Sequence, residues 1–91
     1  MKTHGLKTIQ PYFDQVKNGT KTAELRKNDR DFKVGDYILL QEYEYYGTTL
    51  IPNGRYTTNA ILAEITDVCH YPAALKDGWV MLSFKRLEDL P

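Results

Sequence analysis

The sequence is poor in cysteine, glycine and proline. Its 91 residues include one cysteine, six glycines and four prolines. A single thiol, Cys69, excludes an internal disulfide and a zinc site built from several cysteines. The low glycine and proline content, with 42% apolar residues, excludes collagen-like repeats and argues against disorder. Small secreted domains usually carry disulfides, so we expect a cytoplasmic protein.

Long apolar runs are absent as well. No run approaches the roughly 20 residues that span a bilayer. Residues 1–4 lead directly into patterned sequence, without the apolar segment of a signal peptide. We therefore expect no membrane partner. The length predicts a single domain over residues 1–91, for which a monomer is the simplest state.

The formal net charge is zero, because 12 basic residues balance 12 acidic ones. The balance hides an asymmetry: residues 1–33 hold eight bases and four acids, whereas residues 34–91 hold four bases and eight acids. Zero net charge argues against a non-specific polyanion binder, whose affinity depends on many phosphate contacts. The basic N-terminal third predicts either a local anion site or surface charges that pair on folding.

Histidine and cysteine, two common metal ligands, are scarce. The chain has two histidines, His4 and His70, and its one cysteine directly precedes the second. Neighbouring residues of a strand point to opposite faces, so Cys69 and His70 would not share a ligand. Neither a metal-ligand spacing nor a glycine-rich phosphate loop is present. We expect no metal, no cofactor and a structural role for Cys69.

The hydrophobic pattern predicts one early helix. Residues 3–9 alternate as a short strand, after which the period changes. A two-turn helix is expected between Pro11 and Gly19, since proline suits a first helical turn and Asn18-Gly19 is typical of a helix end. Its apolar face has the spacing i, i+3, i+4 and i+7 and consists of Ile9, Tyr12, Phe13 and Val16.

The remaining sequence is typical of strands. Strands are predicted over residues 20–26, 37–43, 56–68 and 79–84, with a frayed end at 86–89. Asn53-Gly54 predicts a type I′ hairpin turn, because both central positions of that turn need positive φ. Four or five strands with one helix indicate an α+β fold, built on a curled sheet or a β-barrel, because closure removes exposed sheet edges.

The strand after Gly19 carries the most informative polar pattern. Alternation places Lys21, Ala23 and Leu25 on an inward face, and Glu24 with Arg26 on a face toward solvent or a cleft. A carboxylate beside a guanidinium can read a nucleobase edge: the acid accepts from an exocyclic amine, and the arginine donates to carbonyl oxygens. The alternative is an exposed strand with an ordinary salt bridge.

A family resemblance rests on these residues. Gly19, Lys21, Glu24 and Arg26 match the pattern Gly-x-Lys-x-x-Glu-x-Arg, which resembles the signature of ASCH domains in the PUA-like superfamily of small β-barrels. The strings at residues 4–7, 12–13, 26–32, 34–36 and 75–83 resemble a subfamily of phage and bacterial proteins catalogued as DUF3850. The resemblance covers nearly the whole chain except residues 44–56.

The resemblance implies a domain that binds RNA, a nucleotide or a modified nucleoside. In that interpretation Lys21 and Arg26 hold phosphate or carbonyl oxygens, and Glu24 accepts from a base amine. Asn28 and Arg30 would rim the cleft. His4, which opens the first strand, would border the cleft or lie in solvent as a terminal histidine.

Two other functions stay open. One branch of the superfamily hydrolyses an amide on N4-acetylated cytidine, with a lysine at the position of Lys21, a threonine at that of Glu24 and a glutamate from a later segment. This chain keeps the lysine, has Glu24 in place of the threonine, and offers only Asp67 and Asp77 near the later segment. Catalysis by Lys21 and Glu24 would make the protein a small amidohydrolase. A protein-interaction module with a vestigial cleft is the third possibility.

Tyrosines crowd the least regular stretch of the sequence. Tyr43, Tyr45, Tyr46 and Tyr56 lie within or beside residues 44–56. Tyrosine stacks on the bases of single-stranded RNA, but it is also common in β-hairpins for packing reasons. Both interpretations are compatible with the sequence.

Overall fold

The computed structural model describes residues 1–48 and 50–90. Over these residues the chain forms five strands and one helix, in the order β1 (Thr3–Ile9), α1 (Tyr12–Lys17), β2 (Ala23–Lys27), β3 (Tyr37–Tyr45), β4 (Gly54–Cys69) and β5 (Trp79–Leu90). In the described part of the chain, no helix has the length and apolar character needed to cross a membrane.

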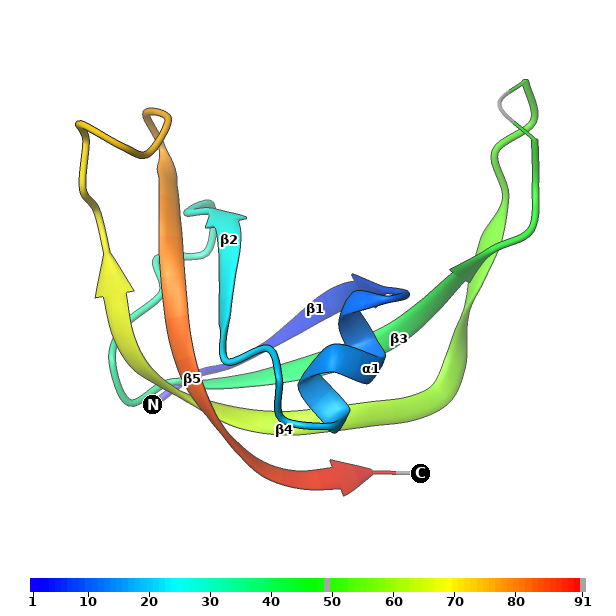
Figure 1. Cartoon of the computed structure of the whole chain (residues 1–91), viewed down its shortest axis with the longest axis horizontal. Helices are drawn as coiled ribbons and strands as arrows, with labels where there is room; N and C mark the ends of the chain where they lie inside the picture. Colours follow the sequence, from blue (N-terminus) through cyan, green and yellow to red (C-terminus); the bar gives the residue numbers. More distant parts are fainter. Residues whose placement is uncertain (49, 91) are drawn as a thin grey trace.

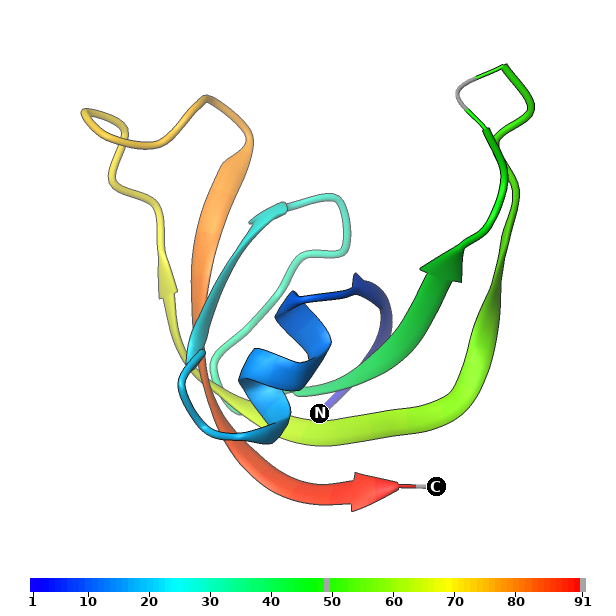
Figure 2. The same ribbon diagram turned by 45° about the vertical axis from the view of Figure 1, so that its right-hand side comes forward.

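The strands form a single curled sheet in the order β1-β3-β4-β5-β2. β1 and β3 are parallel, and the other neighbouring pairs are antiparallel. Helix α1 lies inside the curl in both views (Figures 1 and 2). β1 and β2 stand at the two ends of the order, with no ladder between them in the described residues. The curled sheet is thus confirmed as an open half-barrel, without the hydrogen-bonded closure of a complete barrel.

The core fills the inside of the curl. Alternate residues of β1, β3, β4 and β5 point inward, and the register places them side by side: Leu40 lies opposite Ile61, and Ile65 opposite Phe84. Two side chains of α1 and one from the β2–β3 connection complete this core. Its buried apolar members are Leu6, Phe13, Val16, Phe32, Ile38, Leu40, Ile61, Ala63, Ile65, Val80, Leu82 and Phe84.

The early helix and its end are confirmed. α1 buries Phe13 and Val16, and Gly19 follows it with φ +86°, a conformation that favours glycine. The expected apolar face is narrower than the spacing suggests. Ile9 belongs to β1, and Tyr12 is about half exposed because it lies off the face of α1 that buries Phe13 and Val16.

The expectation that Leu25 lies on the inward face of β2 is wrong. Glu24 is only 8% exposed and Leu25 is 56% exposed, so the polar row points inward. Cross-strand pairing explains the reversal: Glu24 lies opposite the buried Leu82, and Leu25 lies opposite the exposed Met81. Because β2 is an edge strand, its inner face lines the open side of the half-barrel and accommodates polar side chains.

Two further expectations need correction. Residue pairing between β3 and β4 extends to Tyr45 and Gly54, so Gly54 begins β4 and is not a central residue of a tight turn. Positive-φ glycines among the described residues are Gly19, Gly35 and Gly78. The segment 86–89 is not frayed, since β5 continues to Leu90 and pairs with β4 there.

Candidate ligand cleft

A cleft of about 550 Å³ occupies the open side of the half-barrel, between the two edge strands. We call it the edge cleft. It is lined by residues 6–9 of β1 and 24–27 of β2, and by Tyr12, Lys21, Asp29, Arg30, Phe32 and Trp79. A volume of this size lies in the range of small-molecule sites, which is roughly 300–1,000 Å³.

Glu24 and Arg26 form an ion pair on the inner face of β2. Arg26 Nε donates to Glu24 Oε2 at 2.5 Å. No hydrogen bond to Glu24 Oε1 occurs among the described residues, in which every fully buried side-chain nitrogen or oxygen has a partner. Oε1 is therefore not fully buried, and because Glu24 lines the edge cleft, this oxygen can accept a hydrogen bond from a ligand there.

Arg26 of β2 and Arg30 of the β2–β3 connection both donate hydrogen bonds to the backbone of β1. Arg26 Nη2 donates to the Lys7 backbone oxygen at 2.7 Å, and Arg30 Nη1 donates to the Gly5 oxygen at 2.9 Å. A guanidinium has five N–H donors in a fixed plane. Arg26 uses two of them in these contacts, so three remain for a ligand in an orientation that β1 fixes.

The edge cleft is basic and partly aromatic. Its lining has two carboxylates, Glu24 and Asp29, against five cationic side chains, and its rim carries Tyr12 and Trp79. The cations are Lys7, Lys21, Arg26, Lys27 and Arg30. Zero net charge over the whole chain thus coexists with a local excess of positive charge. Such a concave basic surface attracts anions.

Lys21 and Glu24 share the edge cleft, contrary to the expected opposite faces. The regular strand begins only at Ala23, and the Lys21 amide donates to the Gln15 oxygen of α1. Alternation therefore does not govern the direction of the Lys21 side chain. Its Nζ lies 5.5 Å from the centroid of the Tyr12 ring.

His4 lies in the interior and does not line the edge cleft. Its Nε2 is 2.9 Å from Asp36 Oδ2, and its ring packs edge-on against Phe32. The expectation of a solvated terminal histidine is wrong, since both partners of the pair are buried. The His4 hydrogen bond, helped by the backbone N–H groups of Lys2 and Lys33, lowers the pKa of Asp36.

Asn28 also lies outside the residues that line the edge cleft. Its Oδ1 accepts from the Phe32 amide and closes the turn after β2. Asn28, His70 and Asp77 line a second, smaller cavity of about 220 Å³. Arg30, in contrast, lies in the edge cleft as expected. In the described residues, no group of three or more His, Cys, Asp or Glu side chains could hold a metal ion.

Sequence reasoning missed several lining residues. Lys7, Phe32 and Trp79 reach the edge cleft from three separate segments. No local pattern signals them, because β1 and β2 are distant in the strand order and come together only through the curl of the sheet. The basic bias of residues 1–33, which supply all five cations, was the one available signal.

Two comparisons with known proteins found similarities, and one of them names a family. The model of a domain of unknown function, DUF3850, matches residues 3–84. An Escherichia phage P2 protein, described as an uncharacterized 12.9 kDa protein in the GpA 3′ region, is 37% identical over 76 residues. That match covers 84% of this chain and 62% of the phage protein, so the chain spans about three fifths of that relative's length. Because the family model covers most of its length, the chain belongs to the DUF3850 family.

Proposed function

We propose that the edge cleft binds a nucleotide, free or within an RNA chain, through a base that carries an exocyclic amine. The observation that carries the proposal is the Glu24–Arg26 pair, in which an accessible carboxylate oxygen lies beside a guanidinium with three unused N–H donors. Cytosine offers a complementary edge: its N4 amine donates, and its ring nitrogen N3 and its O2 carbonyl accept. The resemblance to ASCH domains of the PUA-like superfamily supports this interpretation.

The residues around the Glu24–Arg26 pair are suited to the phosphate of a nucleotide and to stacking of its base. Lys21, Lys27 and Arg30 line the same cleft and can neutralise a phosphate. The Tyr12 and Trp79 rings at the rim offer surfaces on which a base can stack. A buried carboxylate with a fixed arginine needs little rearrangement on binding, which favours affinity.

Binding of cytidine 5′-monophosphate and uridine 5′-monophosphate tests the proposal. At position 4 of the base, cytosine has an amine and uracil has a carbonyl. Titration calorimetry should show tighter binding of the cytidine nucleotide. Glu24→Gln should reduce the preference, since the amide can offer an N–H where the carboxylate offers only acceptors. Lys21→Ala should weaken both nucleotides, whereas Lys85→Ala, which removes an exposed lysine of β5 outside the cleft, should change neither. Absence of binding, or binding that Glu24→Gln and Lys21→Ala leave unchanged, would refute the proposal.

Amide hydrolysis at the same site is a second candidate, favoured by one observation. Lys21 and Glu24 line one cleft, so the amine and a carboxylate can reach the same ligand. A hydrolase needs a group that moves protons and donors for the developing oxyanion. Against it, Glu24 is already bonded to Arg26, and neither Asp67 nor Asp77 lines the edge cleft.

A further inference from the structure

The β3–β4 hairpin extends beyond the rest of the sheet as an arm. We call its described residues, 43–48 and 50–56, the tyrosine arm. In Figures 1 and 2 this arm rises at one end of the half-barrel, and the β4–β5 connection rises at the other. The arm lies outside the core, so packing of the core does not account for the aromatic side chains it carries.

Three tyrosines of the arm form one cluster. The central ring, Tyr43, meets Tyr45 and Tyr56 edge-on, with ring centroids 5.1 and 5.0 Å apart. Edge-to-face contacts are a favoured geometry and restrict the rings. Nevertheless Tyr45 is 60% exposed and Tyr56 is 52% exposed. The cluster therefore holds flat aromatic surfaces in fixed positions and leaves them open to solvent.

Lys7 connects the cluster with the edge cleft. Lys7 is one of the residues that line the cleft, and its Nζ lies 4.2 Å from the Tyr43 ring centroid and 6.0 Å from that of Tyr45. A chain that continues out of the cleft past Lys7 consequently meets the tyrosines. The lysine also places a positive charge where the two surfaces meet.

Hydrogen bonds at Glu42 fix the base of the arm. Glu42 Oε1 accepts from Thr57 Oγ1 at 2.8 Å and from Asn59 Nδ2 at 3.1 Å, and Oε2 accepts from Gln10 Nε2 at 2.5 Å. The contacts tie β3 to β4 and to the segment before α1, at the irregularity in the ladder between Gln41 and Tyr43. Bonds from Thr57 and Asn59 lower the pKa of Glu42, so the carboxylate stays charged in this role. The tyrosine arm thus has a set direction relative to the cleft.

We propose that the tyrosine arm stacks the bases of a single-stranded nucleic acid that has one nucleotide in the edge cleft. The inference rests on the proposed function and extends it from a nucleotide to a chain. Every base has a π-face, so exposed rings bind successive bases without regard to sequence. The cleft cations, with Lys7 at the junction, complement the phosphates. On the arm itself, Arg55 is paired with Glu44 at 2.7 Å, so the arm contributes stacking and little net charge.

The test compares cytidine 5′-monophosphate with a cytidine tetranucleotide. Tyr45→Ala and Tyr56→Ala should each weaken tetranucleotide binding at least about fivefold, the low end for loss of one base–aromatic stack. Neither should alter binding of the mononucleotide, which reaches only the cleft. Tyr45→Phe should keep the affinity, because the ring remains. The dependence of binding on salt should be unchanged by Tyr45→Ala and reduced by Lys21→Ala, since only the lysine meets a phosphate.

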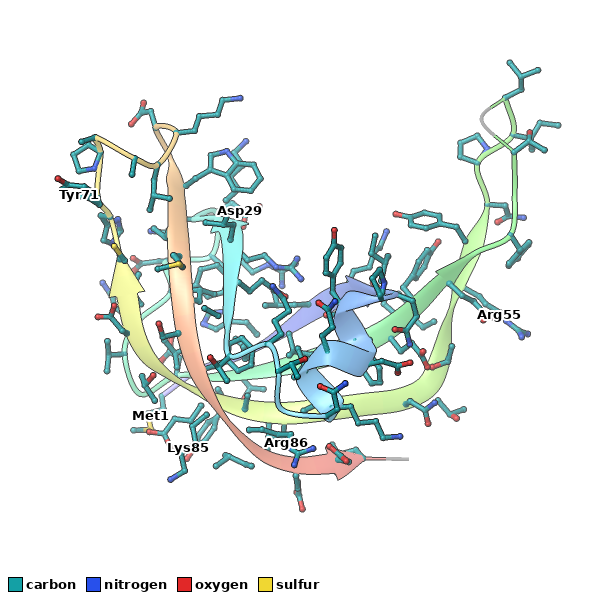
Figure 3. The ribbon with its side chains drawn as sticks, in the orientation of Figure 1. Met1, Asp29, Arg55, Tyr71, Lys85 and Arg86 are labelled. Carbon is teal, nitrogen blue, oxygen red and sulfur yellow. The ribbon has the colours of Figure 1, made fainter. Side chains whose placement is uncertain are left out.

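Tyr71→Ala is the matched control. Tyr71 is 62% exposed, close to the value for Tyr45, and lies at the end of the molecule opposite Arg55 of the arm (Figure 3). If Tyr45→Ala and Tyr56→Ala bind the tetranucleotide as Tyr71→Ala does, the inference is wrong, while the mononucleotide data still decide the proposed function separately. Sedimentation that shows a dimer lost in Tyr45→Ala, with tetranucleotide binding intact, would identify the arm as a contact between copies and would also overturn the inference.

Discussion

Arg26 Nη2 donates to the backbone oxygen of Lys7 at 2.7 Å and so joins the two edge strands of an open sheet. The same guanidinium pairs through Nε with Glu24, which is buried beneath it. One side chain therefore holds the mouth of the cleft together and prepares its polar surface. Stability and ligand binding are coupled at this residue.

Loss of the Arg26 side chain should destabilise the fold. Arg26→Ala leaves the buried Glu24 carboxylate without its ionic partner and separates β2 from β1, at an expected cost of about 2 kcal/mol in the free energy of unfolding. Glu24→Gln/Arg26→Met should recover part of that loss, because no unpaired charge is buried. Urea denaturation measures both. Equal stability of Arg26→Ala and the wild type would show that the contacts of Arg26 with Glu24 and Lys7 contribute nothing to the stability of the fold.

The His4–Asp36 pair predicts a loss of stability in acid. In the unfolded chain the pKa of Asp36 is near 3.8, and in the folded state it is lower. The folded state therefore keeps this carboxylate charged at a pH where the unfolded chain binds a proton. The stabilisation is complete above about pH 3.8 and is lost as the pH falls through the lower folded value. Denaturation across this range should show a weaker pH dependence in Asp36→Asn. The exposed carboxylate of Asp67 gives the control, and Asp67→Asn should retain the wild-type dependence.

Gly54 should be required for the geometry of the tyrosine arm. A Cβ at this position would lie 2.5 Å from Tyr43 Cε1 and 2.6 Å from the Glu44 oxygen, closer than real contacts allow. Gly54→Ala should therefore cost about 1–3 kcal/mol through overpacking and displace the Tyr43 ring. In a Tyr43→Ala background the same substitution should cost less, because the ring clash is gone. Identical costs in both backgrounds, measured by denaturation, would contradict this account.

Turnover of N4-acetylcytidine should be absent or only trace. Glu24 is hydrogen-bonded to Arg26. Among the described residues, neither Asp67 nor Asp77, the carboxylates near the later segment, lines the edge cleft. Chromatography of the purified protein with the nucleoside will detect released cytidine. Robust hydrolysis that Lys21→Ala abolishes would make the amidohydrolase the primary function, since Lys21 and Glu24 do share the cleft.

Local chemistry in the sequence was sufficient for the order of elements and for the candidate strand. The spacing of Phe13 and Val16, ended by Gly19, predicted α1, and alternation predicted most of the strands. These features depend on neighbours a few residues apart, which is why periodicity reports them. The motif from Gly19 to Arg26 likewise identified a segment that lines the edge cleft.

Only the tertiary structure decided which face of β2 points inward. An apolar Leu25 beside polar neighbours predicted the opposite orientation. Glu24 is buried because Leu82 lies across from it on β5 and because Arg26 neutralises it, and both partners depend on the pairing of β2 with β5. Local alternation contains no information about such pairing.

Tertiary structure also decided the partner of His4, the lining of the edge cleft and the position of the tyrosine arm. His4 meets Asp36 across 32 positions of sequence, and Arg26 meets Lys7 across 19. Lys7 touches Tyr43 because β1 and β3 are parallel neighbours. Sequence determined which side chains the molecule possesses and how each short segment folds. The curl of the sheet determined which of them meet, because contacts between distant strands form only when the whole core is packed.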